Sequence, residues 1–418
     1  MIVYKFGGAS VKDAEGVRNL TDIISNNKDE KLVIVVSAMG KITNALEKVY
    51  KSYLKCLPDK TENFEEVKKY HHQIVWELFG KKSKAVMDSL DEEFIKLKQI
   101  LSTEPSFERD YEYDRIVSFG EILSSKIVFE YLKSQNIELK WVDIRSCLKT
   151  DETYREAKVD FERSLPLIEE AFNEKGINIY LTQGFIGGTL SGNSTTLGRE
   201  GSDYSAALIS FFLNAENVTI WKDVEGVLNA DPRLMHDAVK LNEISYHEAI
   251  ELAYYGAQII HPKTIKPLEN KKIPLYVKPF LSYKEQGTLI HEIKESICIP
   301  PVYIVKSNQV LISISPKDFS FIAEDNLSQI FAKLAKHRMK VNLMQNSAIS
   351  FSIVTDNDES KIHYFIGELG SSFKILYNQN LELITIRHYT SDAVSRMINN
   401  KQVFLQQKSR NTVRFVVK

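Results

Sequence analysis

Two segments of the chain combine glycines with charged side chains as an anion-binding site would. The first, KFGGAS at residues 5–10, places a lysine beside two glycines at the end of an apolar run. Since glycine has no side chain, backbone N–H groups there can approach an anion closely, and a following helix adds its positive N-terminal end. The GxxxxGK[ST] spacing of a Walker loop is missing. Alone, the segment fits either a phosphate-binding loop or a tight turn with a solvated lysine.

The second segment is TTLGREGSD at residues 195–203, ahead of an apolar helical stretch. Ser202 or Asp203 would cap that helix, which is sufficient to account for their presence. Capping does not explain Arg199, nor the several glycines just upstream. Glu200 is interpreted as a solvated loop acid. The loop therefore predicts a binding role for its arginine.

Two more places are candidates for the same site. Glu121, in SFGEILSS, begins a predicted helix, where the helix dipole favours an acid in any case. The segment WKDVEGVLNADPR at residues 221–233 follows a predicted strand. Turn formation explains its glycine and proline, but not the grouping of Lys222, Asp223 and Arg233 around one loop.

Histidines and cysteines form no recognisable metal motif, and we predict no metal site built by the protein. There is no HExxH cluster and no CxxC spacing among the nine histidines and three cysteines. His261 precedes a proline and is expected to fix a turn. His71 and His72 are expected on a solvated helix face. An odd number of widely spaced cysteines fits a reduced, cytoplasmic protein.

Composition points to small ligands. The 418 residues are 43% hydrophobic and 26% charged, as in globular proteins with two or three domains. Lys plus Arg, 54, balances Asp plus Glu, 55, so no basic field suggests nucleic acid or an anionic membrane as partner. No apolar run approaches the roughly 18 residues of a membrane span, and the N-terminus has no signal-peptide pattern.

The elements that position these residues alternate between strand and helix, which predicts an α/β fold with a mostly parallel sheet between helices. Residues 44–101 interrupt this order as a mostly helical insertion. Strands are predicted at 2–6, 31–36, 137–144, 177–187, 217–224 and 273–280, and helices at 119–134, 164–176, 202–215 and 245–257.

Beyond residue 287 the pattern changes, and Ile299-Pro300-Pro301 is typical of a domain boundary. We predict a first domain at 1–296 and, at 297–418, two small α+β modules of one plan, the last one shortened. Strands are expected at 310–316, 340–345, 349–355, 381–387, 401–409 and 412–418, and helices at 327–335 and 391–398.

Taken together, KFGGAS, SAMGKITN, SFGE, TQGFIGGTLSGNSTTLGREGSDYSAAL, WKDVEGVLNADPR and YYGAQIIHPKT resemble the aspartate kinases of the amino acid kinase family. The resemblance covers about the first 290 residues, and the C-terminal pair is similar to that family's ACT regulatory domains. It implies the amino acid kinase (carbamate kinase-like) fold. It also implies transfer of the ATP γ-phosphate to the β-carboxylate of L-aspartate, the first step of lysine, threonine and methionine biosynthesis.

The resemblance also implies roles for individual residues. Lys5 and Asp203 would be catalytic, and Thr43, Glu121, Arg199 and Ser202 would bind aspartate. The ATP-binding positions would be Lys5, Phe6, Gly7, Gly8, Lys222, Asp223, Leu228, Arg233, Gln258 and Ile259. Mg²⁺ would arrive with the nucleotide. Ala9, Glu200, Lys222, Leu228 and Gln258 depart from the family's usual residues, which puts details of nucleotide contact in question.

Elementary chemistry agrees with these roles. Arg199 can bind the α-carboxylate of aspartate bidentately, and Glu121 can pair with its ammonium. The β-carboxylate is ionised at neutral pH and needs no general base. Lys5, glycine amides and Mg²⁺ would relieve the repulsion between the two anions. Asp203 would orient either Lys5 or the substrate ammonium.

Regulation and assembly are further expectations. The family's ACT pairs commonly sense lysine or threonine, but Asn342 and Ala348 stand where lysine-sensitive relatives often carry acids, so we expect weak or absent lysine inhibition. The resemblance also implies a homodimer or higher homo-oligomer, and a monofunctional kinase without a fused homoserine dehydrogenase. The alternative function is a catalytically weak, amino-acid-sensing regulator on the same fold.

Overall fold

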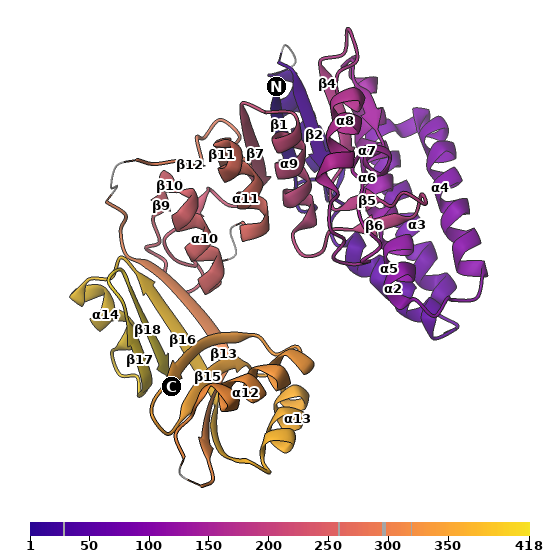
Figure 1. Ribbon diagram of the computed structural model, residues 1–418. Coiled ribbons are helices and arrows are strands. Elements are labelled where there is room, and N and C mark those ends of the chain that lie inside the picture. Colours follow the sequence, from indigo (N-terminus) through magenta and orange to yellow (C-terminus); the bar gives the residue numbers. More distant parts are fainter. Residues whose placement is uncertain (28–29, 258–259, 295–297, 319) are drawn as a thin grey trace. The chain divides into compact units, whose positions relative to one another are not determined.

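The computed structural model describes residues 1–418 except 28–29, 258–259, 295–297 and 319 (Figure 1). The chain forms two compact units. The first comprises residues 1–227, 240–250 and 259–296, and the second comprises 228–239, 251–258 and 297–418. Each unit has its own sheet.

The first unit is built on an eight-stranded sheet in the order β10-β12-β11-β7-β1-β2-β4-β3. All described pairings in it are parallel except that of β11 with β12. Central strands such as β1, β2 and β4 are buried along their whole length, as expected for a parallel sheet covered on both faces. The strands are β1 Ile2–Phe6, β2 Leu32–Val36, β3 Lys140–Val142, β4 Ile179–Gln183, β7 Asn217–Lys222, β10 Glu243–Ser245, β11 Leu275–Pro279 and β12 Thr288–His291.

Helices cover this sheet, and the predicted α/β class is confirmed. The predicted strand at 177–187 is divided, because Phe185 has a φ of 66° that ends the extended run after β4. The chain resumes in a short hairpin of β5 Ile186–Gly188 and β6 Ser194–Thr196. The helices are α1 Ala14–Ser25, α5 Arg109–Val117, α6 Phe119–Ser134, α7 Ile144–Cys147, α8 Phe161–Ala171, α9 Gly201–Phe212, α10 Tyr246–Tyr255 and α11 Pro262–Lys271, and the short strands β8 Val227–Leu228 and β9 Lys240–Leu241 pair with each other.

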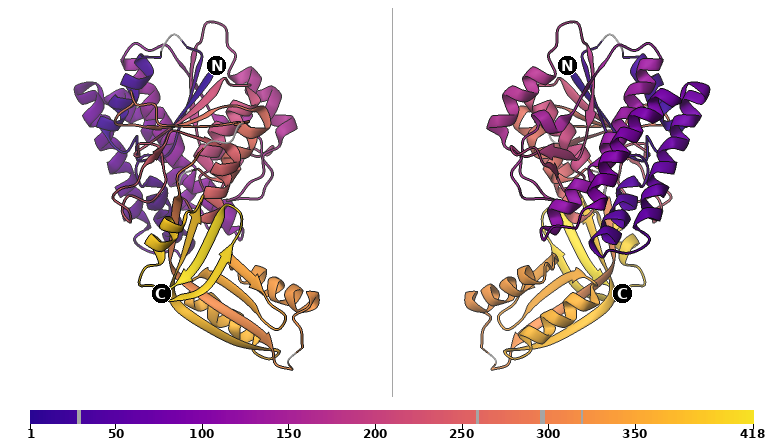
Figure 2. Two further views of the ribbon diagram at one scale, coloured as in Figure 1. Left: turned by 90° about the vertical axis from the view of Figure 1, so that its left-hand side faces the viewer. Right: turned by 90° about the vertical axis from the view of Figure 1, so that its right-hand side faces the viewer.

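The region expected to be a helical insertion contains α2 Ile42–Leu54, α3 Lys60–Phe79, the 3₁₀ turn η1 Gly80–Lys82 and α4 Lys84–Ser102. Helices α3 and α4 run side by side (Figures 1 and 2). The prediction of a solvated His71 is wrong. Its ring is fully buried, lies 5.9 Å from the Phe94 ring centroid, and Nδ1 is 2.7 Å from the Val67 carbonyl oxygen. His72 is partly exposed and bonds to Asp91.

The buried His71 is expected to make stability depend on pH. Burial lowers the pKa of His71 to about 4. The unfolded chain binds a proton near pH 6.5, whereas the folded chain does not until about pH 4, so folding stability falls with decreasing pH by up to roughly 3 kcal/mol. Urea unfolding at about pH 5 and about pH 7.5 isolates this contribution as a difference between variants: relative to His71→Leu, the wild type should lose about 2 kcal/mol on going to the lower pH. His72→Leu is the matched control and should keep the loss.

The second unit contains a six-stranded antiparallel sheet in the order β14-β15-β13-β16-β18-β17. Its two central strands are 15 residues each, and β13 begins at Val302, eight residues before the predicted strand. One half of each long strand belongs to each predicted module. The bounds are β13 Val302–Pro316, α12 Glu324–Lys336, β14 Val341–Asn346, β15 Phe351–Asp356, α13 Glu359–Leu369, β16 Phe373–Arg387, α14 Ser391–Ile398, β17 Val403–Lys408 and β18 Thr412–Val417.

The sharing of the long strands explains how the second module is completed. Residues 309–314 of β13 pair with β15, and residues 309–316 pair with the first part of β16, while Val302–Lys306 pair with Leu383–Arg387 of β16. The β16 end then pairs with β18. Each module therefore has four strands, although helix α13, which the sequence pattern missed, serves only the first of them.

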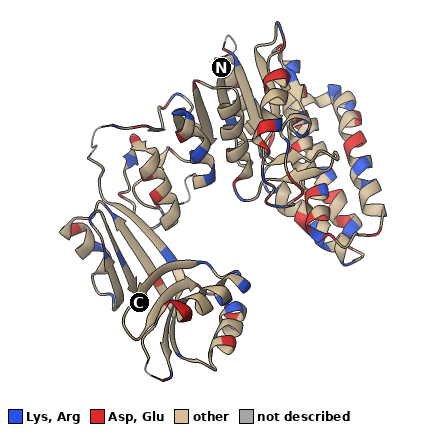
Figure 3. Ribbon diagram, viewed as in Figure 1, with Lys and Arg blue, Asp and Glu red and all other residues tan. Residues whose placement is uncertain are grey.

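Surface features agree with the composition. Lys and Arg are interspersed with Asp and Glu on helices of the first unit (Figure 3). Within the described residues, no helix is long and apolar enough to cross a membrane.

Candidate active site

The predicted phosphate-binding loop lies at the carboxyl ends of central strands. Lys5 is in β1, whose neighbours are β2 and β7, and Gly7 and Gly8 follow this strand. A side chain on Gly8 would lie 2.7 Å from the Ala38 carbonyl oxygen and 2.9 Å from that of Gly40, so only glycine permits this approach of the two loops. Ligands of open α/β sheets bind at such carboxyl ends.

Lys5 and Asp203 form a buried ion pair at this edge. The Lys5 ammonium is 2.5 Å from Asp203 Oδ1, and the two side chains are 9% and 4% exposed. The Lys222 ammonium is 3.5 Å from Asp203 Oδ2. Burial acts to raise the pKa of Asp203, but the two ammonium groups hold it below its ordinary value. The structure thus brings Lys222, expected only as a nucleotide contact, to the same carboxylate.

Helix α9 presents Asp203 from its first turn. The helix begins at Gly201, so the prediction that Ser202 or Asp203 caps it is wrong. The N-cap is Glu200, which has left-handed backbone with φ 52°, makes no capping bond and is only partly exposed, with Oε2 buried. It is therefore not the plain solvated acid expected. Since Asp203 makes no cap, its carboxylate remains available to Lys5.

Glu121 lies at the start of α6 and is 2% exposed. Its Oε1 accepts a hydrogen bond of 3.3 Å from the backbone N–H of Ala38, while Oε2 is buried without a hydrogen-bond partner among the described residues. Burial raises the pKa of Glu121 to about 8. A buried, unpaired carboxylate oxygen is what an incoming ammonium group would satisfy.

The other predicted substrate residues lie on the same unit. Thr43 is in the first turn of α2 and Ser202 in the first turn of α9, and both are half-buried. Arg199 lies in the loop before α9, and its guanidinium makes no ion pair within the described part of the chain. It is therefore free to meet an anion.

The residues predicted to bind the nucleotide do not all lie in one place. The Phe6 ring is core and stacks on Trp221 with centroids 6.0 Å apart, so only its backbone can face a ligand. Asp223 is exposed after β7. Leu228 and Arg233 belong to the second unit, where Arg233 pairs with Asp231 at 2.6 Å as part of a turn. Gln258 and Ile259 lie outside the described residues.

Two residues that hold the arginine loop, residues 195–200, were missed by sequence reasoning. The Lys263 ammonium donates to the Leu197 carbonyl oxygen at 3.0 Å and lies 4.7 Å from the Tyr204 ring centroid. Asp114 in α5 accepts hydrogen bonds from Thr196. Neither stands in a motif. For Asp114, the one signal in the sequence was an acid on an otherwise buried face of a helix. His261 caps α11, accepting from the Lys263 N–H at 3.2 Å, as a turn-fixing residue should.

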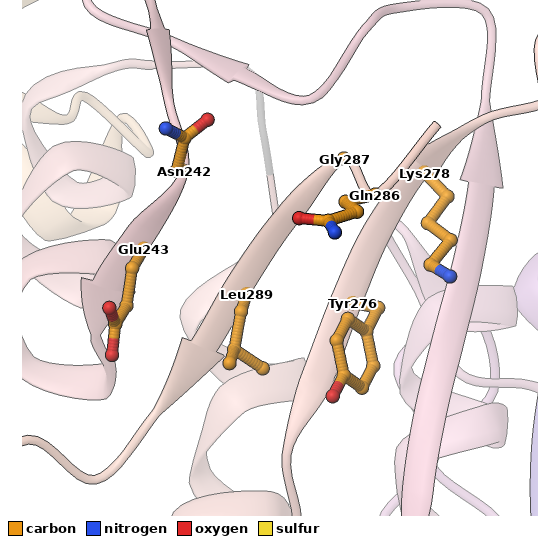
Figure 4. A pocket seen from close by; sticks show the side chains of 7 residues that line it. All are labelled: Asn242, Glu243, Tyr276, Lys278, Gln286, Gly287 and Leu289. Atoms are coloured by element: carbon orange, nitrogen blue, oxygen red, sulfur yellow. The ribbon is translucent and has the colours of Figure 1, made fainter. Parts of the chain in front are cut away.

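A separate pocket of about 460 Å³ lies on β10, β11 and β12 (Figure 4). By strand register, Lys278 pairs with Trp221 and Trp221 with Phe6, whereas Lys5 pairs with Ile220. Paired residues share a face, so this pocket opens on the sheet face opposite Lys5 and Asp203. It is lined by Asn242, Glu243, Tyr276, Lys278, Gln286, Gly287 and Leu289.

Metal ligands are not preassembled in the described part of the chain, where no group of three or more His, Cys, Asp or Glu side chains could hold an ion. Asp203 is already engaged by two ammonium groups. These residues therefore fit Mg²⁺ that is held chiefly by nucleotide phosphates, a common arrangement for this ion.

Comparisons with known proteins extend over both units. The model of the amino acid kinase family matches residues 1–279. The chain is 30% identical over 367 residues to lysine-sensitive aspartokinase 3 of Escherichia coli (strain K12), covering 86% of this chain and 79% of that protein. It is 32% identical over 315 residues to bifunctional aspartokinase/homoserine dehydrogenase 2 of Arabidopsis thaliana, of which it covers 32%.

Solved structures give the same result. The crystal structure of E. coli aspartokinase III in complex with aspartate and ADP is similar with a TM-score of 0.83 and 25% sequence identity, covering 100% of this chain and 96% of that chain. The same enzyme in complex with lysine and aspartate gives the same values.

Proposed function

The chain belongs to the amino acid kinase family as an aspartokinase, and from this premise we propose which of its residues carry the reaction. An aspartokinase transfers the γ-phosphate of ATP to the β-carboxylate of L-aspartate, giving 4-phospho-L-aspartate. The observation that carries the proposal is the buried cluster of Lys5, Asp203 and Lys222 at the carboxyl ends of β1 and β7.

The phosphate end of the site consists of Lys5, Lys222 and the backbone of Gly7 and Gly8. Both ammonium groups lie at the Asp203 carboxylate, so two cations are in place to meet the phosphates. Mg²⁺ bound to the phosphates would neutralise part of their charge. Asp203 orients Lys5, since its Oδ1 already holds that ammonium. This contact favours Lys5 over the substrate ammonium as its partner.

The aspartate end consists of Thr43, Glu121, Arg199 and Ser202. Arg199 binds the α-carboxylate, and the unpaired Oε2 of Glu121 accepts the α-ammonium. These two contacts direct the β-carboxylate toward the γ-phosphate. Because that carboxylate is ionised at neutral pH, catalysis requires alignment and charge stabilisation and no general base.

The remaining assignments follow the family pattern. The nucleotide also contacts Asp223, Leu228, Arg233, Gln258, Ile259 and the backbone of Phe6. Residues 1–296 form the catalytic domain and 297–418 the tandem regulatory domains. The enzyme works as a homodimer or higher homo-oligomer, and its three free cysteines suit a cytoplasmic protein.

Trapping of the acyl phosphate tests the function directly. The protein is incubated with Mg·ATP and aspartate in the presence of hydroxylamine, which converts an aspartyl phosphate to a hydroxamate. Hydroxamate is expected from aspartate and not from glutamate. No hydroxamate from aspartate, or equal amounts from the two amino acids, would contradict the assignment.

Weak or absent inhibition by lysine is a separate expectation. Asn342 is buried, and its amide nitrogen donates to Gln309 Oε1 at 2.8 Å and to Asp356 Oδ1 at 2.9 Å. Its Oδ1 accepts from the Lys306 ammonium at 3.0 Å. A neutral amide that is already engaged beside a cation supplies no counter-charge for a bound lysine.

In roughly 1 mM lysine, a concentration far above a micromolar dissociation constant, the enzyme should therefore keep more than about nine-tenths of the activity that it has without lysine. The lysine-sensitive E. coli relative, assayed in parallel, is the positive control. Half-inhibition of the protein below that lysine concentration would refute the expectation.

A further inference from the structure

The arginine loop is held on three sides. The Leu197 N–H donates to the Phe185 carbonyl oxygen at 2.8 Å, and the Leu197 carbonyl oxygen accepts from the Lys263 ammonium at 3.0 Å. The third contact is with Asp114, whose side chain is 0% exposed. A loop so held can keep Arg199 in one position.

Asp114 joins two separate backbone segments with one carboxylate. Its Oδ2 accepts from the Thr196 N–H at 2.7 Å and from the Arg155 N–H at 2.9 Å. Its Oδ1 accepts from the Thr196 hydroxyl at 2.7 Å. Three hydrogen bonds, two of them from the buried Thr196, make this carboxylate costly to remove.

The segment around Arg155 also contacts the arginine loop directly, at Thr196 and at Gly198. The Ala157 N–H donates to the Thr196 carbonyl oxygen at 3.0 Å. Gly198 has φ 77°, and a side chain on it would lie 3.2 Å from the Arg155 carbonyl oxygen. The backbone of Gly198 therefore rests against the segment that Asp114 fixes, so movement at Arg155 displaces Gly198 and the arginine after it.

We propose that Asp114 is a positioning residue for substrate binding: by tying Thr196 to Arg155 it sets the place of Arg199, and through it the affinity for the α-carboxylate of aspartate. This inference rests on the proposed role of Arg199. Asp114 contacts no substrate, and its effect is confined to the aspartate end of the site. Burial raises the pKa of Asp114 to about 6, and the hydrogen bonds from Thr196 and Arg155 act in the opposite direction, in favour of the carboxylate.

The substitution Asp114→Ala is expected to raise KM for aspartate at least tenfold, since a displacement of about 1 Å can cost up to 10²-fold, and to leave KM for ATP within about twofold. Asp114→Asn should restore KM to within about threefold. Its carbonyl can accept both backbone N–H groups, and its amide can donate to the Thr196 hydroxyl.

Glu112 provides a matched control on the same helix. It is also buried, at 1% exposure, but accepts from the Ser106 N–H at 3.0 Å and from Arg115, away from the arginine loop. Glu112→Ala should leave KM for aspartate unchanged. A rise equal to that of Asp114→Ala would overturn the proposal, as would a parallel rise in KM for ATP.

A double-mutant cycle isolates the route through Arg199. In an Arg199→Met background, adding Asp114→Ala should raise KM for aspartate less than about twofold, because the positioned group is gone. A further tenfold rise would refute the proposal. If Asp114→Ala does not fold, Thr196→Val removes only the hydroxyl contact and should raise KM for aspartate about threefold, and no rise would refute it. Absence of hydroxamate from the unmodified protein would instead refute the proposed function.

Discussion

Replacing Lys5 with methionine is expected to lower kcat by about 10³-fold, because the ammonium that meets the transferred phosphoryl group is lost. Methionine keeps an unbranched side chain of similar length, so the strand β1 should be little disturbed. KM for aspartate should change far less than kcat, since Lys5 belongs to the phosphate end. Steady-state release of ADP measures both constants.

The same substitution leaves Asp203 buried beside one ammonium, that of Lys222 at 3.5 Å. Removing one partner of a buried ion pair destabilises a protein by up to about 3–5 kcal/mol, and the remaining contact with Lys222 should reduce this loss. The double substitution Lys5→Met/Asp203→Asn should regain most of that stability and none of the activity. Loss of activity is thereby separated from loss of folding.

Lys31 offers a control from the same sheet. It is exposed immediately before β2, at the amino end of the strands and away from the proposed phosphate site. Lys31→Met should leave kcat unchanged. A fall of less than tenfold for Lys5→Met would remove Lys5 from the catalytic role.

Glu121 is expected to make aspartate binding strongly dependent on pH. With its pKa raised to about 8 by burial, the carboxyl is mostly protonated at neutral pH and must ionise to accept the substrate ammonium. Raising the pH supplies the ionised form, so KM for aspartate should fall roughly tenfold per pH unit from about pH 6 and level off near pH 8. Binding below that pH should release a proton, measurable as a buffer-dependent enthalpy.

The substitution Glu121→Gln removes both the charge and the titration. KM for aspartate should rise about 10²-fold at pH 8.5 and lose its slope, since a charge-assisted hydrogen bond in a buried site is replaced by a neutral one. Glu93→Gln is a control, because Glu93 is also buried but pairs with Lys96 and Lys126. A slope that persists in Glu121→Gln would assign the pH dependence to another group.

Local patterns predicted much of this molecule. Continuous apolar runs marked β1, β2 and β4, because strands buried on both faces have no polar side to show. The glycine loop and Asp203 were found because a simple turn requires neither paired glycines beside a lysine nor so many charges. The helix start at Gly201 was missed, since Ser202 and Asp203 look equally suitable as caps.

Contacts between distant segments could not be predicted in this way. Lys222 meets Asp203 only because β7 lies beside β1 in the sheet, an order that no local pattern specifies. His71 falls on the buried side of α3 because α4 packs there. Asp114 acts on residues 41 and 82 positions away. In each case the partner, and not the residue's own neighbourhood in sequence, decides its role.

The two long central strands of the second unit have a consequence for how that unit can change. Because β13 and β16 each run through both modules, no cut between the modules avoids breaking a backbone ladder. The pair should melt as one cooperative transition, and neither half is expected to survive excision. Deletion or exchange of a single module should therefore unfold the unit, in evolution as in engineering, whereas the whole sheet can be replaced without cutting a shared strand.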